Sequence, residues 1–288
     1  MIRQSKAVSA ITLTTMALLA FAGNSILCRM ALKDGAIDAA SFTSIRLISG
    51  ALALLVIVAV NSSVSKLRQS GSWLSASMLF LYALGFSYAY IDLEAGTGAL
   101  ILFGMVQATM IIAALINGDR PTAIEILGWV CATAGLVYLV LPGIEAPSAA
   151  GSVLMGVAGI AWGVYSIRGK SESDPVVSTA SNFLRSAAFL PLVFAASFQS
   201  IQWTTTGVLL AMLSGVVTSG IGYVVWYAAL THLKTIRAAL VQLSVPAIAA
   251  LGGVALLGEP LSHRLIVSSA LILGGILIAL SWKSRTKP

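Results

Sequence analysis

The chain has 288 residues, of which 58% are hydrophobic and only 9% are charged, with 17 Lys and Arg against 10 Asp and Glu. Soluble domains carry roughly a quarter of their residues as charged side chains, so this composition excludes a water-soluble enzyme. The formal net charge of +7 does not indicate a nucleic-acid binder, because the basic residues are scattered between apolar runs and do not form one solvated patch.

Ten apolar runs follow one another along the chain, each bounded by charged, Gly, Pro or Ser-rich residues. A helix of about 20 residues crosses a bilayer, so ten crossings leave too little sequence for a separate domain outside the membrane. The runs lie at residues 7–32, 41–60, 72–91, 95–116, 123–142, 149–169, 176–197, 205–231, 236–257 and 264–282. We therefore predict an all-α polytopic membrane protein with ten transmembrane helices.

The first run has an alternative interpretation as a cleaved signal peptide. Arg3 and Lys6 precede it, and the Ala-Phe-Ala sequence at residues 20–22 resembles a signal-peptidase site. The apolar stretch continues past that site to Leu32, which makes it longer than the apolar region of a signal peptide. We expect the run to remain as the first transmembrane helix.

The distribution of basic residues predicts the orientation of the chain. With the N-terminus placed in the cytoplasm, twelve of the 17 Lys and Arg fall on the cytoplasmic side. Arg29, Lys33 and Arg264 fall outside, and Arg46 and Arg185 lie within predicted spans. Because loops rich in Lys and Arg stay in the cytoplasm, both termini are predicted to be cytoplasmic.

The two halves of the sequence match when one is shifted by about 140 residues along the other. The matched positions are Gly118-Asp119-Arg120-Pro121 with Gly258-Glu259-Pro260, Gly23 with Gly163, and Arg46 with Arg185. Five spans in each half is an odd number, so the second half enters the membrane from the opposite side. We predict two inverted five-helix repeats at residues 7–142 and 149–283, an arrangement typical of secondary transporters with a mid-membrane binding site. A chance match of Ala, Leu and Gly is the alternative explanation.

These features together resemble the EamA-type branch of the drug/metabolite transporter superfamily. The resemblance is carried by the Gly-Asp/Glu-(Arg)-Pro signature after the fourth and ninth spans, the single Arg early in the second and seventh spans, and Trp162-Gly163 in the sixth. It covers essentially the whole chain, and the pattern is most similar to the YddG-like exporters of aromatic amino acids in the bacterial inner membrane. The chain departs from the family in the first span, where Phe21-Ala22-Gly23-Asn24 stands in place of the usual Trp before the glycine.

The titratable residues offer no proton relay inside the membrane. All ten acidic residues and both histidines lie at or near predicted span ends, whereas proton-coupled transporters usually place such a group in the pathway. We therefore expect a facilitator or exchanger, with a coupling group near an interface as the alternative. Cys28 and Cys131 have no metal-ligand spacing, and we expect no metal and no cofactor.

Arg46 and Arg185 have two possible roles. A cation inside a span requires carbonyls, water or a ligand anion as partner. Either residue could bind a substrate carboxylate, or each could tie helices together from a position within about two turns of its helix end. Because the two residues are equivalent under the repeat, we favour the structural or gating role for both. Pro246, which removes a helical hydrogen bond in the ninth span, is a further candidate hinge.

A site for an uncharged amphipathic group needs aromatic walls with a few amides and hydroxyls. Spacing of four residues along a helix puts pairs of such side chains on one face. The candidate substrate-binding residues are Asn24, Tyr82, Phe86, Gln107, Trp162, Ser166, Tyr223, Trp226, Tyr227 and Gln242. Helix packing is the alternative role of the aromatics, and hydrogen bonding between helices is that of the amides.

Composition and periodicity predict a polytopic membrane protein with polar and aromatic groups at depth. The resemblance implies an exporter of small amphipathic metabolites, foremost Phe, Trp and Tyr, working by alternating access. Its partners are the small-molecule substrate and the lipid bilayer, with no nucleic acid and no obligate protein partner. Export of drugs or other metabolites is the alternative within transport. A lipid-modifying membrane enzyme is disfavoured, because the acids and histidines near span ends form no ligand or acid/base motif.

Overall fold

The computed structural model describes residues 2–61, 64–118, 120–143, 145–170, 172–197, 201–233, 238 and 241–286, with side chains described within residues 10–279 of these ranges. Over these residues the regular structure is helical, and one isolated antiparallel bridge joins Ile37 to Trp203. A helix bonds its backbone polar groups within its own segment, which is what a chain in hydrocarbon requires.

The helices follow the predicted spans. They are α1 (Ile2–Leu32), α2 (Ala39–Asn61), η1 (Val64–Arg68), α3 (Trp73–Ala89), α4 (Ala95–Ile116), α5 (Ala123–Val140), α6 (Ala149–Gly169), α7 (Pro175–Ser186), η2 (Ala187–Phe189), α8 (Leu190–Ser197), α9 (Thr205–Leu213), η4 (Ser214–Ile221), α10 (Gly222–Leu230), α12 (Ser244–Leu257) and α13 (His263–Thr286). Seven helical segments of the described chain are long and apolar enough to cross a membrane, and three shorter apolar helices occupy the other predicted spans. The beginning of the ninth predicted span, 236–257, lies partly outside the described residues.

Three of the predicted spans contain an interruption of the α-helix within their described residues. In the span from Pro175 to Ser197, Pro191 has no amide hydrogen to donate to the carbonyl oxygen of Ala187. The 3₁₀ turn η2 begins at Ala187. In the span from Thr205 to Leu230, α9 continues into α10 through η4, an eight-residue π-helix that the sequence analysis did not predict. In α12, Pro246 lies in the first turn, directly after the helix break at Leu243.

Side chains and glycines fix the helix ends. Ser72 Oγ accepts a hydrogen bond from the amide of Ser75 at the start of α3, and Thr122 with Glu125 forms a capping box on α5. At the other ends, Gly118 follows α4 with φ 89° and Gly258 follows α12 with φ 66°. Both glycines adopt a left-handed conformation that other residues disfavour, and both begin the signature that is shared by the two halves.

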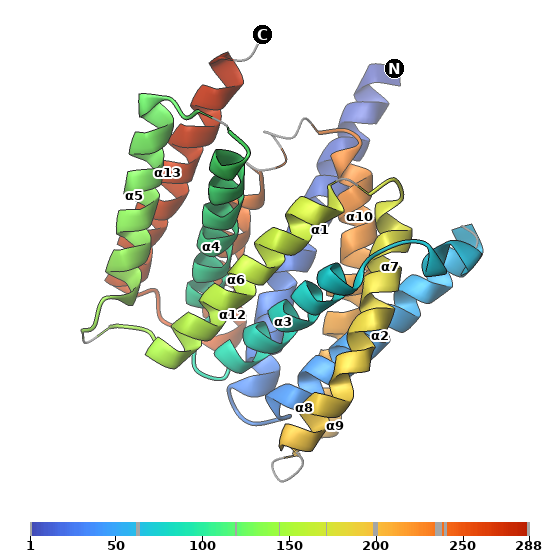
Figure 1. The fold of residues 1–288 in the computed structure, drawn as a ribbon. Coiled ribbons are helices and arrows are strands. Elements are labelled where there is room, and N and C mark those ends of the chain that lie inside the picture. The colour runs from blue at the N-terminus through green and yellow to red at the C-terminus, as the bar shows by residue number, and fades with distance from the viewer. Residues whose placement is uncertain are drawn as a thin grey trace.

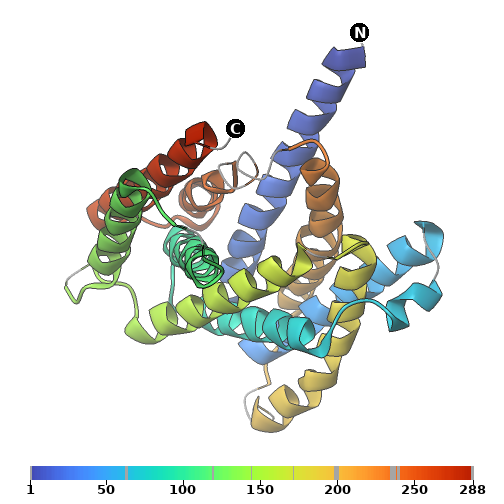
Figure 2. The same ribbon diagram turned by 45° about the horizontal axis from the view of Figure 1, so that its top comes forward.

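The helices pack in related pairs. Helix α3 lies against α6 and α1 lies against α9, η4 and α10, while α4 packs on α6 and α1 on α12. Three further contacts join α2 to α7, α4 to α12, and α5 to α13. Figure 1 places the beginning of α1 and the end of α13 at the same end of the bundle, which we call the terminal end. In Figures 1 and 2, α5 and α13 run side by side at one edge.

Glycines allow the closest helix contacts. A methyl group added at Gly215 in η4 would meet the Ser49 hydroxyl and the Arg46 carbonyl oxygen, and the Gly50 amide nitrogen would lie 3.0 Å away. A methyl group at Gly159 in α6 would lie 2.7 Å from the Leu102 carbonyl oxygen of α4. Small residues therefore bring the backbones of α2 and η4, and of α4 and α6, into near contact.

Gly215→Ala is expected to destabilise the protein, because the new methyl group meets rigid backbone of α2. Overpacking of this kind typically costs about 1–3 kcal/mol, so the thermal midpoint of the detergent-purified protein should fall. Gly156→Ala in α6 is the matched control, since its methyl group would contact only Met105 Cγ, at 3.9 Å. Equal midpoints for the two variants would contradict the close packing of α2 on η4.

Candidate functional site

A cavity lies where α1, α2, α3, α4, α6, η4 and α10 converge. Its lining residues are Phe21, Asn24, Ser25, Arg46, Tyr82, Phe86, Leu102, Phe103, Trp162, Thr218, Ser219, Tyr223 and Gln242. Each of these side chains is buried or partly buried. In this conformation the remaining space admits a water molecule but not an amino acid, so a larger ligand requires the helices to move apart.

Aromatic rings form much of the cavity wall. The ring of Trp162 in α6 lies 4.7 Å from that of Tyr82 in α3 and 5.2 Å from that of Tyr223 in α10. Phe86 lies 5.3 Å from Tyr82, and Phe21 lies 6.1 Å from Tyr223. Ring faces and edges at these separations pack on one another, and they can pack in the same way on a planar apolar ligand.

Arg46 brings a positive charge into this wall. Its side chain is 2% exposed, its Nη2 donates to the Tyr82 hydroxyl at 2.9 Å, and its Nε donates to Ser219 Oγ at 3.3 Å. The guanidinium carbon lies 5.0 Å from the centre of the Phe86 ring. Among the described residues, Nη1 has no hydrogen-bond partner and no carboxylate lies within ion-pair distance of the guanidinium.

Asn24 links three elements around the same cavity. Its Nδ2 donates to the Tyr82 hydroxyl at 3.1 Å. Its Oδ1 accepts hydrogen bonds from Ser214 Oγ at 2.7 Å and Thr218 Oγ1 at 3.2 Å. The Asn24 amide therefore fixes the Tyr82 hydroxyl that also receives the Arg46 hydrogen bond.

Seven of the residues singled out in the sequence line this cavity. They are Asn24, Arg46, Tyr82, Phe86, Trp162, Tyr223 and Gln242. The lining also includes Ser219 and the adjacent Thr218, which were not among the candidate binding residues. Phe21, Ser25, Leu102 and Phe103 were not singled out, because apolar and small side chains are common on every span.

The other residues singled out lie outside the cavity lining. Gln107 is buried on α4, Ser166 Oγ donates to the Trp162 carbonyl oxygen, and Trp226 packs against Phe21 with ring centres 5.7 Å apart. Tyr227 lines a second, smaller pocket. Pro246 lies in the first turn of α12.

Arg185 occupies a setting unlike that of Arg46. It donates to the backbone carbonyl oxygens of Ser70 at 2.7 Å and Arg68 at 3.4 Å, and so it ties α7 to the segment between α2 and α3. The two arginines that match in the sequence are therefore not equivalent in their contacts.

A smaller polar pocket lies where the end of α6, the beginning of α7 and the end of α10 meet. Its lining residues are Ser75, Tyr165, Gly169, Glu172, Pro175, Ser178, Thr179, Asn182 and Tyr227. The Tyr165 hydroxyl lies 3.4 Å from Thr179 Oγ1, which lies 3.3 Å from the Tyr227 hydroxyl. These hydroxyls connect α6, α7 and α10 through hydrogen bonds, so the pocket has a packing role in this conformation.

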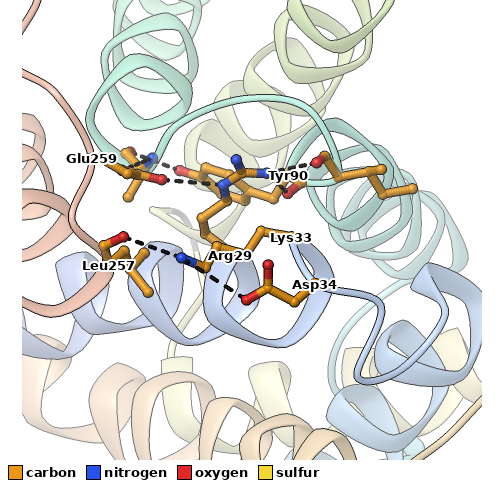
Figure 3. Close-up of polar contacts among 8 residues, drawn as sticks. Arg29, Lys33, Asp34, Tyr90, Leu257 and Glu259 are labelled. Carbon is orange, nitrogen blue, oxygen red and sulfur yellow. Dashed lines mark hydrogen bonds and ion pairs between the residues drawn. The ribbon is translucent and has the colours of Figure 1, made fainter.

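An ion pair joins the end of α1 to the segment after α12 (Figure 3), and the end of α1 lies opposite the terminal end of the bundle (Figure 1). Arg29 Nε of α1 lies 3.1 Å from Glu259 Oε1 after α12, and Glu259 Oε2 accepts the Ala95 amide hydrogen at 2.8 Å. Arg29 Nη1 also donates to the carbonyl oxygens of Tyr90 at 3.1 Å and Ile91 at 2.6 Å. We call this cluster the Arg29–Glu259 lock, because it joins α1, α12 and the segment between α3 and α4.

Two neighbours extend the lock. Lys33 Nζ donates to the Leu257 carbonyl oxygen at 3.1 Å, which adds a second link from α1 to α12 (Figure 3). The pKa of Glu94 is raised, chiefly by burial and to a smaller extent by repulsion from the Glu259 carboxylate. The positive charge of Arg29 and a hydrogen bond with Thr97 partly offset this increase. Glu94 is thus the acid beside the lock whose proton affinity is increased.

Glu259→Gln is expected to weaken the lock, because the neutral amide loses the ionic attraction to Arg29. Hydrogen bonds to charged groups contribute about 1.5–3 kcal/mol, so the thermal midpoint should fall by several degrees. Asp34→Asn is the matched control, since the Asp34 side chain is 77% exposed and lies 4.0 Å from Lys33. The lock would have no stabilising role if both variants melted at the wild-type temperature.

Comparison with known proteins identifies the family. The model of the EamA-like transporter family matches residues 149–281. The uncharacterized protein PA1977 of Pseudomonas aeruginosa is 49% identical over 93% of this chain and 93% of its own. This chain belongs to the EamA-like transporter family.

More distant relatives agree with that assignment. The uncharacterized transporter YoaV of Bacillus subtilis is 23% identical over 85% of this chain and 88% of its own. An uncharacterized transporter of Archaeoglobus fulgidus is 25% identical over 92% of this chain and 94% of its own. A solved crystal structure shares the fold, with a TM-score of 0.68, 20% identity and coverage of 96% of this chain and 98% of that one. This EamA-like chain is accordingly a multi-pass membrane transporter, and its cavity is the candidate transport site.

Proposed function

We propose that this transporter exports small amphipathic metabolites, foremost the aromatic amino acids Phe, Trp and Tyr, by alternating access. The observation that carries the proposal is the cavity, which combines rings on α1, α3, α6 and α10 with one guanidinium and two amides. Aromatic walls suit an aromatic side chain, and a few placed polar groups suit the amino-acid end of the same molecule.

The proposed architecture is a pair of inverted repeats, residues 7–142 and 149–283. It is supported by the helix contacts, because exchanging each helix with its counterpart turns the contact of α3 with α6 into that of α1 with α9–α10. The same exchange turns the contact of α4 with α6 into that of α12 with α1. The left-handed glycines at 118 and 258 add to this support. Residues from both proposed repeats line the cavity, as expected for a site between inverted halves.

The proposed orientation places both termini in the cytoplasm of a bacterium, with the chain in its inner membrane. The bias of Lys and Arg toward the terminal end favours this orientation. The Arg29–Glu259 lock then closes the periplasmic side. Rocking of helices apart at that lock, and together at the cytoplasmic end, would expose the cavity first to one compartment and then to the other.

The proposed transport is facilitated diffusion or exchange. No Asp, Glu or His lines the cavity, so the described residues offer no proton carrier in contact with a bound substrate. Glu94 beside the lock is the position from which a proton gradient would act if transport were coupled.

Purified protein reconstituted into liposomes should release labelled Phe, Trp or Tyr down the gradient of that amino acid. The initial rate should be the same with and without an imposed pH gradient. Trp162→Ala removes the central ring of the cavity, and we expect an initial rate about tenfold lower. Trp203→Ala is the matched control, because that indole is 66% exposed and lies outside the cavity, where its backbone pairs with Ile37 between α1 and α2. Absence of flux for all three amino acids would refute the substrate assignment, and strict dependence on the pH gradient would refute the facilitator.

Loop accessibility in intact cells tests the orientation of the two repeats. Single cysteines at Lys66 and Glu172, introduced after replacing Cys28 and Cys131, should resist a membrane-impermeant thiol reagent. Cysteines at Asp34 and Trp203 should react with it. Labelling that places corresponding loops of the two halves on the same side of the membrane would refute the inverted repeat.

A further inference from the structure

We propose that Arg46 binds the carboxylate of the substrate, and that the cavity selects aromatic monocarboxylates whether or not they carry an α-ammonium group. This inference rests on the proposed function, because it assigns the chemical class that the same cavity recognises. It goes further in making the negative charge, and not the amino-acid identity, the recognised feature.

The first observation is the incomplete coordination of the guanidinium. Tyr82 and Ser219 accept hydrogen bonds from Nη2 and Nε, and the guanidinium carbon lies over the Phe86 ring, so the guanidinium is held in place before any ligand binds. Arg46 is buried, at 2% exposed, and yet its Nη1 has no protein acceptor among the described residues. An arginine does not lose its proton in a protein, so this nitrogen remains a charged donor that requires an acceptor.

The second observation is the charge of the surroundings. Arg46 is the one ionised side chain among the described lining residues, and the ion pairs of the described chain lie at the lock, away from it. A single buried cation is balanced by a single anion, since a buried unpaired charge is unfavourable. A carboxylate supplies that one charge together with two oxygens that match the guanidinium geometry. A dianionic phosphate would replace the excess positive charge by an excess negative one.

The third observation is the lack of an anionic partner for an ammonium group. The lining contains no carboxylate within the described residues, and Asn24 Oδ1 already accepts hydrogen bonds from Ser214 and Thr218. The Tyr82 hydroxyl accepts from both Arg46 and Asn24. An ammonium group in this cavity would meet only neutral oxygens, of which those of Asn24 and Tyr82 are already engaged, and it would be repelled by Arg46. It therefore adds less to binding than the carboxylate, and an amine without a carboxylate is disfavoured.

Arg185 supplies the contrast within the same chain. It matches Arg46 in sequence position, but its guanidinium donates to the backbone carbonyl oxygens of Ser70 and Arg68, and it lies outside the cavity. Replacing Arg185 is therefore expected to affect stability without changing which ligand charge is preferred.

The test compares three molecules that share a phenyl ring. In proteoliposomes that exchange labelled Phe, unlabelled 3-phenylpropionate should compete at least as well as Phe, and 2-phenylethylamine should compete at least tenfold less well. Arg46→Gln should lower Phe exchange at least tenfold and abolish the difference between the acid and the amine. Arg46→Lys keeps the charge and should keep the preference for the acid, while Arg185→Gln should retain the wild-type ratio.

A second readout separates binding from transport. In detergent, 3-phenylpropionate should raise the thermal midpoint of the wild-type protein and of Arg185→Gln, but not that of Arg46→Gln, whose folding is verified by its elution in gel filtration. Equal competition by the amine and the acid, or an unchanged preference in Arg46→Gln, would overturn the inference. Thermal stabilisation by 3-phenylpropionate without any exchange would refute the proposed transport and leave the Arg46 site standing. Exchange of Phe with no preference for the acid would do the reverse.

Discussion

Hydrocarbon provides no hydrogen-bond partners, and this constraint governs the structure from the backbone to the cavity. The backbone is helical because each helix satisfies its own amides and carbonyls. The departures from regular α-helix, at η2, at η4 and before α12, lie within spans that pack against other helices. Within the described part of the chain, charged side chains follow the same constraint, since they lie near the ends of the helices with the exception of Arg46. Arg46 also lines the cavity.

The cavity and the Arg29–Glu259 lock are mechanically connected. Helix α1 carries Arg29 in the lock and Asn24 in the cavity, little more than one turn apart. Helix α3 carries Tyr82 and Phe86 in the cavity wall and leads directly to Tyr90, whose carbonyl oxygen Arg29 binds. Any separation of α1 from α3 at the lock would therefore strain the hydrogen bond from Asn24 to the Tyr82 hydroxyl, which also accepts from Arg46. The glycine contact between α2 and η4 provides a closely packed crossing near the same site.

The sequence predicted the positions of the apolar helices, because a helix in lipid needs an apolar run with recognisable ends; seven of these helices in the described chain are long enough to cross a membrane. Ser72, Thr122 and Gly258 mark such ends in the sequence and end or begin helices in the structure. The π-helix at Ser214–Ile221 was not predictable in this way, since its composition resembles that of an ordinary transmembrane helix. It nevertheless carries Thr218 and Ser219, which lie in the cavity wall.

The candidate site was predictable only in part, because spacing fixes which side chains share a face but not what that face touches. Tyr82 and Phe86 share a face that lines the cavity. Tyr223 lines the cavity while Tyr227, one turn later, reaches the polar pocket beside Tyr165. The structural or gating role of the two arginines stays a prediction, but the equivalence on which it was based does not extend to their contacts. Arg185 donates to backbone carbonyl oxygens, whereas Arg46 donates to the hydroxyls of Tyr82 and Ser219, which are distant in the chain.

In the proposed alternating-access mechanism, the Arg29–Glu259 lock has a further consequence for substrate affinity. If the closed arrangement is favoured without a ligand, part of the interaction energy of a bound molecule is used to separate the helices. The measured affinity is then weaker than the affinity of the open state, by the fraction of molecules that are already open. In return, a carrier that rests with the lock closed would separate the two compartments while it is empty.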